Sequence, residues 1–232
     1  MITKLNLTIA NVYIVVGARP VVVDTGAPGS APKILAALAK QGFQPADVGL
    51  ILLTHAHSDH AGSAAALRQA TGAPVAIHHG DLAMLRRGDN GRMLPTDFEA
   101  RLSQRFVDKP FPALEPDIVL DNGSDLRALG LDADLLPTPG HSSGSISLLF
   151  ANGDAIVGDI LRGGLMGGTF LSSRPTYPFF LYDLADKAVI HASVQAVLDR
   201  RVQRLFTGHG GPLSRPEVER WLANQRKHST SL

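Results

Sequence analysis

Three histidines and one aspartate lie within six consecutive positions of this chain, as His55, His57, Asp59 and His60. Several imidazoles packed side by side are costly to bury without partners, and they repel one another once they are protonated. A divalent cation removes this difficulty, because it keeps the imidazoles neutral and the carboxylate ionised while it draws them together. The pattern therefore predicts a metal site, in preference to a His-rich surface loop.

Three further residues of ligand type follow predicted strands, namely His141, Asp159 and His209. Taken singly, each would more often be an ordinary polar residue, but their shared placement after strands favours a common site. If these loops meet at one edge of the fold, seven side chains converge. Seven is more than one tetrahedral ion needs, and it suits two ions that share a bridge. Flanking glycines would permit the tight turns that such loops need: Gly140, Gly208 and Gly210.

The hydrophobic pattern predicts strands interrupted by helices along the whole chain, which indicates a layered α/β fold. The expected strands are 5–9, 11–16, 20–24, 49–54, 74–78, 118–120, 125–129, 134–137, 145–150, 155–158 and 203–206. Helices are expected between Ser30 and Gly42, at 64–69, 82–87, 97–106 and 184–198, and after Ser214. Ser214 and Glu217 have the spacing of a capping box.

Composition favours an ordinary globular protein, with 44% hydrophobic and 19% charged residues and a net charge of +1. We expect one domain over residues 1–232, with an insertion at 88–116 and an active-site loop at 161–182. The chain has no cysteine, which excludes disulfides and thiolate ligands. With no leader pattern and no long apolar run, we expect a cytoplasmic protein that acts on a small molecule, without a nucleic-acid or membrane partner. The composition specifies no oligomeric state.

In their order along the chain, these motifs resemble those of the metallo-β-lactamase-fold (glyoxalase II-like) hydrolase superfamily. The resemblance covers nearly the whole sequence. It is carried by Asp24-Thr25-Gly26, the His-x-His-x-Asp-His loop, the turn Pro139-Gly140-His141, the pair Gly158-Asp159 and Gly208-His209-Gly210. It implies a four-layer αβ/βα sandwich, in which two mixed β-sheets are flanked by helices and the metals lie at one edge.

The resemblance also implies how the ligands are shared between two divalent metal ions. Asp159 would bridge them, with His55, His57 and His141 on one ion and Asp59, His60 and His209 on the other. Asp24 would orient the histidine loop, with a simple turn cap as the alternative. Zinc is the first choice because imidazole and carboxylate suit it, while iron and manganese accept the same ligands.

The implied reaction is hydrolysis of an ester, thioester or lactone carbonyl in a small metabolite. Two cations about 3.5–4 Å apart lower the pKa of a shared water, so that a bridging hydroxide attacks the carbonyl. One ion would polarise the substrate oxygen. Asp59 is the expected catalytic residue, as an orienter or proton carrier for the nucleophile. The alternatives are a mononuclear iron persulfide dioxygenase, a phosphodiesterase of the same fold, and a metal-binding protein without catalysis.

Departures from the patterns of known subfamilies narrow the substrate. True β-lactamases of this fold lack the bridging aspartate that this chain keeps as Asp159, and flavodiiron proteins carry a glutamate where His57 stands. Acyl-homoserine lactonases place a tyrosine soon after that aspartate, whereas this chain has Ile160, Leu161 and Arg162. Only a short segment follows His209, which argues against the glutathione-binding helical portion of glyoxalase II.

Several residues near the predicted site keep two interpretations. Aromatic side chains of the loop 161–182 would either line a substrate pocket or seal the core: Tyr177, Phe179, Phe180 and Tyr182. Arg162 is predicted to be a solvated loop charge, with contact to an anionic substrate group as the alternative. The remaining histidines are not expected to bind metal: His78, His79, His191 and His228.

Overall fold

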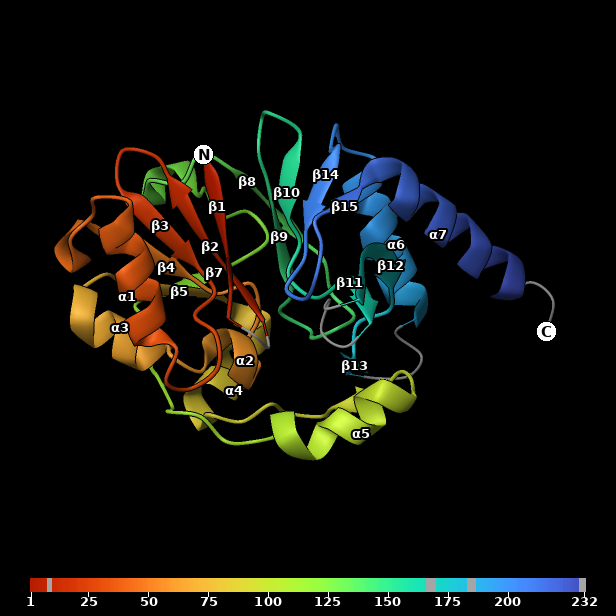
Figure 1. Ribbon diagram of the computed structural model, residues 1–232, viewed down its shortest axis with the longest axis horizontal. Helices are drawn as coiled ribbons and strands as arrows, with labels where there is room; N and C mark the ends of the chain where they lie inside the picture. Colours follow the sequence, from red (N-terminus) through yellow and green to blue (C-terminus); the bar gives the residue numbers. More distant parts are fainter. Residues whose placement is uncertain (8–9, 166–169, 183–186, 230–232) are drawn as a thin grey trace.

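The computed structural model describes residues 1–7, 10–165, 170–182 and 187–229. Two mixed sheets pack face to face, and helices cover the outer face of each (Figure 1). The buried apolar residues form one cluster between the sheets and one under the helices on each side. This is the four-layer arrangement that the resemblance predicts.

The first sheet has the strand order β1-β2-β3-β4-β5-β7. Its strands are β1 (Ile2–Asn6), β2 (Asn11–Val16), β3 (Pro20–Val23), β4 (Leu50–Leu52), β5 (Val75–His78) and β7 (Ile118–Leu120). The first three pair antiparallel, and β3, β4, β5 and β7 pair parallel. Alternation along β2 explains why both faces are buried, since Val12 and Ile14 face the helices while Tyr13 and Val15 face the other sheet.

The second sheet has the strand order β15-β14-β10-β9-β8. Its strands are β8 (Asp134–Pro137), β9 (Ile146–Leu149), β10 (Asp154–Ile156), β14 (Arg204–Phe206) and β15 (Leu213–Ser214). Strands β10 and β14 run parallel, so the loops that follow them leave the sheet at the same end. Those two loops carry Asp159 and His209.

Helices complete the outer layers. Those on the first sheet are α1 (Ala31–Lys40), α3 (Ala64–Thr71) and α4 (Leu82–Arg87), and those on the second are α6 (Lys187–Leu198) and α7 (Arg215–Ser229). Short elements fill the connections: η1 (Pro45–Asp47), α2 (Ser58–Ala61), η2 (His79–Asp81) and η3 (Arg127–Leu129). Among the described residues, none of the helices combines the length and apolar character that a bilayer crossing requires.

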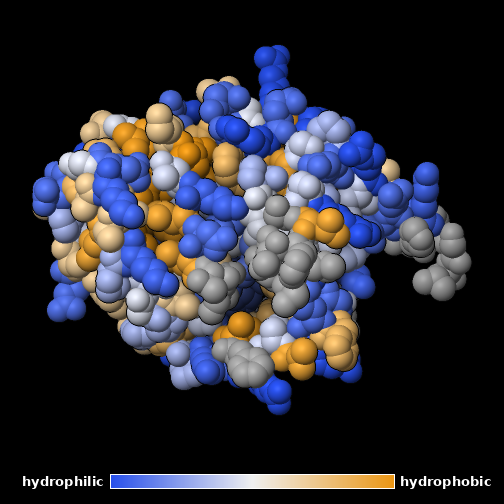
Figure 2. Space-filling view, viewed as in Figure 1, coloured by the Kyte–Doolittle hydropathy of each residue, from blue (hydrophilic) through white to orange (hydrophobic). Residues whose placement is uncertain are grey.

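The insertion 88–116 contains β6 (Leu94–Pro95) and α5 (Phe98–Val107). The insertion leaves α4 in the first half of the molecule and places α5 below the second half (Figure 1). Apolar side chains lie on the surface over α5 (Figure 2), where Phe98 is 80% and Leu102 is 55% exposed. The loop 161–182 is more regular than predicted, because it contains β11 (Arg162–Leu165), β12 (Phe170–Thr176) and β13 (Phe180–Leu181). Strand β13 pairs with β6, so the two segments are joined.

Two local predictions differ from the structure. The strand predicted at 125–129 is wrong, because Asp125 accepts a hydrogen bond from the Arg127 amide at 2.9 Å and starts η3 instead. The strand expected at 5–9 lies earlier, because the pairing with β2 extends from Ile2 to Asn6; residues 8 and 9 lie outside the described residues. The capping box at α7 is confirmed in its main contact, since Glu217 accepts hydrogen bonds from the Ser214 amide and hydroxyl.

Candidate metal centre

The seven predicted side chains lie together at one edge of the molecule, in loops contributed by both sheets. Six of them are buried, and Asp59 has a side-chain exposure of 17%. Their ligand-type atoms form three overlapping groups in which all atoms lie within 4.8 Å of one another. The groups are His55, His57 and His141; His55, His60 and Asp159; and Asp59, His60 and His209.

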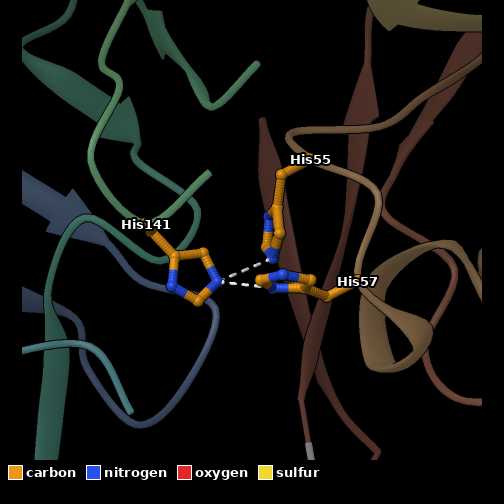
Figure 3. A group of neighbouring side chains, drawn as sticks. All are labelled: His55, His57 and His141. Carbon is orange, nitrogen blue, oxygen red and sulfur yellow. Dashed lines mark hydrogen bonds between the residues drawn. The ribbon is translucent and has the colours of Figure 1, made fainter. Parts of the chain in front are cut away.

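The first group consists of three imidazoles whose ring edges converge (Figure 3). His141 Nε2 lies 2.8 Å from His57 Nδ1 and 3.2 Å from His55 Nε2. The other ring nitrogen of His141 donates to the Phe180 carbonyl at 2.7 Å, and this contact leaves a lone pair on Nε2 that points into the group. Burial lowers the pKa of His57 and His141 to about 4, and that of His55 well below its usual range. At neutral pH these rings are uncharged.

The other two groups mix imidazoles with carboxylates. His209 Nε2 lies 3.0 Å from Asp159 Oδ2 and 3.3 Å from Asp59 Oδ2, and His60 Nε2 lies 3.5 Å from Asp159 Oδ1. Burial alone would lower the pKa of His209, but the neighbouring Asp159 and Asp59 raise it to about 10. The carboxylates likewise raise the pKa of His60 well above its usual range.

Two atoms at the centre of the site have no hydrogen-bond partner among the described residues. They are His60 Nε2 and Asp159 Oδ1, both fully buried. A buried polar atom without a partner is costly, and such atoms in a native structure call for an explanation, such as an ion. These two atoms face one another across 3.5 Å, and a shared cation would satisfy both.

Asp24 contacts the segment that carries His55, His57 and His60, as expected of a residue that orients this segment. It is buried with a φ of 62°, a backbone conformation that is strained for a non-glycine residue. Its carboxylate accepts hydrogen bonds from the Thr54 amide at 2.8 Å and from His60 Nδ1 at 2.9 Å. The second contact fixes the proton on Nδ1, so that Nε2 of His60 presents its lone pair to the site.

The loop that carries His209 is held by the first sheet. Tyr13 donates its hydroxyl to the Thr207 carbonyl at 2.6 Å, and Asn11 donates to the same carbonyl at 2.8 Å. Gly208 has no room for a side chain, since a Cβ there would lie 2.0 Å from Asp159 Oδ1. The glycine predicted to ease a turn is therefore required by close approach to a ligand-type side chain.

Sequence reasoning missed Asp81, which joins two of the loops. This buried carboxylate accepts hydrogen bonds from the Ala56 amide at 3.0 Å, from the Ser142 hydroxyl at 2.7 Å and from the Gly144 amide at 2.7 Å. Ala56 lies between two of the seven residues and Ser142 follows a third. The signal was present, because Asp81 follows strand β5 just as the predicted ligands follow theirs.

The prediction for Arg162 is wrong in its main form. Its side chain is 1% exposed and pairs with Asp97 and Glu99 of the insertion. Among the aromatic residues, Phe180 is buried and Tyr182 is 49% exposed. The other described histidine side chains lie outside the three groups, as predicted: His78, His79 and His191. The side chain of His228 lies outside the described residues.

Comparisons with known proteins agree with this geometry. The family model of the metallo-beta-lactamase superfamily matches residues 5–209. A probable metallo-hydrolase, MJ0888 of Methanocaldococcus jannaschii, is 26% identical over 90% of this chain and 93% of its own length. A hydroxyacylglutathione hydrolase of Rhodopseudomonas palustris is 30% identical over 79% of this chain and 55% of its own length.

Among solved structures, TTHA1623 in a di-iron-bound form is 26% identical, with a TM-score of 0.65 over 95% of this chain and 97% of that one. The family model, the fold and the converging side chains lead to one conclusion: the chain belongs to the metallo-beta-lactamase superfamily of metal-dependent hydrolases.

Proposed function

We propose that this protein is a dinuclear hydrolase that cleaves an ester, thioester or lactone carbonyl in a small metabolite. The observation that carries the proposal is the overlap of the three groups, in which His55, His60 and Asp159 connect the imidazole trio to Asp59, His60 and His209. Connected groups of this kind fit two neighbouring cations better than two independent sites.

The donor set fits divalent metal ions. The seven side chains offer imidazole nitrogens and carboxylate oxygens only, which suit zinc first and iron or manganese as alternatives. The unpartnered atoms His60 Nε2 and Asp159 Oδ1 would become ligands. On this assignment, His55, His57 and His141 hold one ion, Asp59, His60 and His209 hold the other, and Asp159 lies between them.

Cations held there would lower the pKa of a shared water and polarise a substrate carbonyl. The protein's own residues then have distinct tasks. Asp159 presents one oxygen to His60 at 3.5 Å and the other to His141 at 3.7 Å, so it can face both ions. Asp59 is the most exposed of the seven, and we assign it to orient the attacking water and accept its proton. The Phe180 carbonyl and Asp24 keep His141 and His60 in the required tautomers.

A thioester is the first choice among the three carbonyl substrates. The similarity to a hydroxyacylglutathione hydrolase favours a thioester, although the match covers 55% of that protein. The absence of cysteine fits a cytoplasmic protein, and the net charge of +1 fits a small-molecule substrate better than a nucleic acid.

The test is to measure metal identity and stoichiometry of the purified protein and then to assay a thioester, a lactone, an aryl ester and bis(p-nitrophenyl) phosphate. We expect two ions per chain and turnover of a carbonyl substrate. His57→Ala should lose metal and activity together, while His79→Ala, a histidine outside the groups, should lose neither. A single iron with thiol-dependent oxygen uptake would replace the proposal with a dioxygenase. Turnover of the phosphodiester alone would replace it with a phosphodiesterase, and two ions without any turnover would contradict it.

A further inference from the structure

Among the arginines and lysines of the described residues, Arg162 is the most deeply buried, and it lies three positions after Asp159. Its Nε donates to the Tyr177 carbonyl at 3.0 Å, and its Nη1 donates to Glu99 at 3.0 Å. Its Nη2 donates to Asp97. The guanidinium also stacks on the Phe179 ring, 3.9 Å from the ring centre. A buried charge persists only where its partners compensate for lost water, so this set of contacts is a built arrangement.

The two carboxylates come from the start of the insertion helix α5. Asp97 is also the N-cap of α5, because it accepts a hydrogen bond from the Ala100 amide at 2.8 Å. Immediately before it, Thr96 donates its hydroxyl to the Pro178 carbonyl at 2.6 Å, and β6 pairs with β13. The start of the insertion is therefore docked on residues 177–181, with Arg162 at the centre of the contact.

Residues 177–181 in turn contact one residue of the imidazole trio and one residue of the group that contains Asp59, His60 and His209. The Phe180 carbonyl accepts from His141 Nδ1, and the Phe179 ring packs edge-on against His209 with centres 5.3 Å apart. The other end of α5 is also tied to the site, because Ser58, the neighbour of His57, donates its hydroxyl to the Val107 carbonyl at 2.9 Å. Contacts thus run without interruption from α5 to both sides of the metal centre.

We propose that Arg162 is a positioning residue that fastens the insertion to the metal centre. Residues 94–107 and 177–181, here called the α5 wall, would then form one substrate-facing side of the pocket that the guanidinium holds in place. The expected change in KM rests on the proposed function, whereas the expected change in amide hydrogen exchange does not. This role needs no contact between Arg162 and the substrate, because each of the three guanidinium nitrogens already donates to a protein oxygen on one of two segments.

The test compares Arg162→Met, Arg162→Lys and Glu99→Gln with Arg101→Met, an exposed arginine of the same helix. In Arg162→Met, we expect amide hydrogen exchange across 94–107 to accelerate at least tenfold and KM to rise at least tenfold, with two ions per chain retained. Lysine keeps the charge but cannot bind both carboxylates and the carbonyl together, so Arg162→Lys should restore only part of the protection. Arg101→Met should match the wild type in every readout.

Two results would overturn the proposal. Wild-type exchange across 94–107 in Arg162→Met would show that the guanidinium does not hold the α5 wall. Loss of metal together with kcat, at unchanged KM, would show that Arg162 only supports the ligands. Should Arg162→Met fail to fold, Glu99→Gln decides on the same readouts, since the Glu99 side chain is 29% exposed and its loss is tolerable. If no substrate is turned over, the proposed function fails, whereas the exchange comparison still tests Arg162.

Discussion

The histidines on the two sides of the metal centre have pKa values that are shifted in opposite directions. The imidazole trio forms one side, and Asp59, His60 and His209 form the carboxylate side. His55, His57 and His141 are kept neutral by burial, and the pKa of the last two falls to about 4. His60 and His209 are equally buried, but the carboxylates beside them raise the pKa of both, to about 10 for His209. One side is thus ready for a cation at neutral pH, while the other holds protons where the cation would bind.

Removing Asp159 should have the largest effect, because this carboxylate touches both sides. It lies 3.0 Å from His209, 3.5 Å from His60 and 3.7 Å from His141. For Asp159→Ala we expect less than one ion per chain and a loss of kcat/KM of about 10³-fold or more. The control is Asp154→Asn at the start of β10, the strand that precedes Asp159, where the side chain pairs with Arg204. Two retained ions in Asp159→Ala would rule out the bridging assignment.

Removing His57 should separate the two sides, because this residue belongs to the imidazole trio alone. We expect His57→Ala to retain about one ion per chain, held by the carboxylate side, with a loss of activity of about 10²-fold or more. Metal analysis of the purified variant measures this directly. Loss of both ions would mean that the two sides bind their ions cooperatively. The difference in histidine pKa between the sides would then not determine how metal binds.

Asp24→Asn should affect one side only. The Asp24 carboxylate holds Nδ1 of His60 and does not contact the trio. Supporting residues of this kind typically change metal affinity by about 10- to 100-fold. A competition titration with a chromophoric chelator should therefore show weakening of one of the two ions. Equal weakening of both would show that Asp24 acts through the whole histidine loop, since it also anchors Thr54.

The smallest effect is a difference in pH dependence between the two ions. His60 and His209 both have raised pKa values, to about 10 for His209, so each carries a proton at pH 7 that a cation must displace. The affinity of that side should therefore rise with pH across the neutral range, by up to about a hundredfold per pH unit. His57 and His141, with pKa values of about 4, have already lost theirs, so the trio's affinity should stay constant between pH 6 and pH 8. Calorimetry in buffers of different protonation enthalpy measures the protons released. Equal proton release on binding of the first and the second ion would contradict the predicted difference between the two sides.

The sequence predicted the site better than it predicted the surroundings of the site. Each of the seven residues lies in a connection that follows a strand, with Asp59 and His60 on the short helix α2. The sheets position these connections, so the convergence of the side chains follows once the strands are recognised. Asp81 also follows a strand, but it was missed because the neighbouring His78 and His79 were not expected to bind metal.

Arg162 could not have been placed from its sequence neighbours. Its partners Glu99 and Asp97 lie 63 and 65 positions away, in an insertion whose path no local pattern records. The strands β11 and β12 were missed for a related reason. Among the described residues they pair only with each other, from Arg162 opposite Thr176 to Leu165 opposite Phe170. Strand β11 has two adjacent glycines and β12 has a proline, and these residue types are more typical of loops than of strands.

The hydrogen bonds between β2 and the loop of His209 affect the order in which the two sides of the metal centre form. The hydrogen bonds from Tyr13 and Asn11 to Thr207 join residues 194 and 196 positions apart. Contacts between such distant parts of a chain form slowly, because a large loop must close before they gain any energy. We therefore expect the imidazole trio to bind its cation before His209 is in place. A newly synthesised or partly unfolded chain would then hold one ion until the loop of His209 has docked on β2.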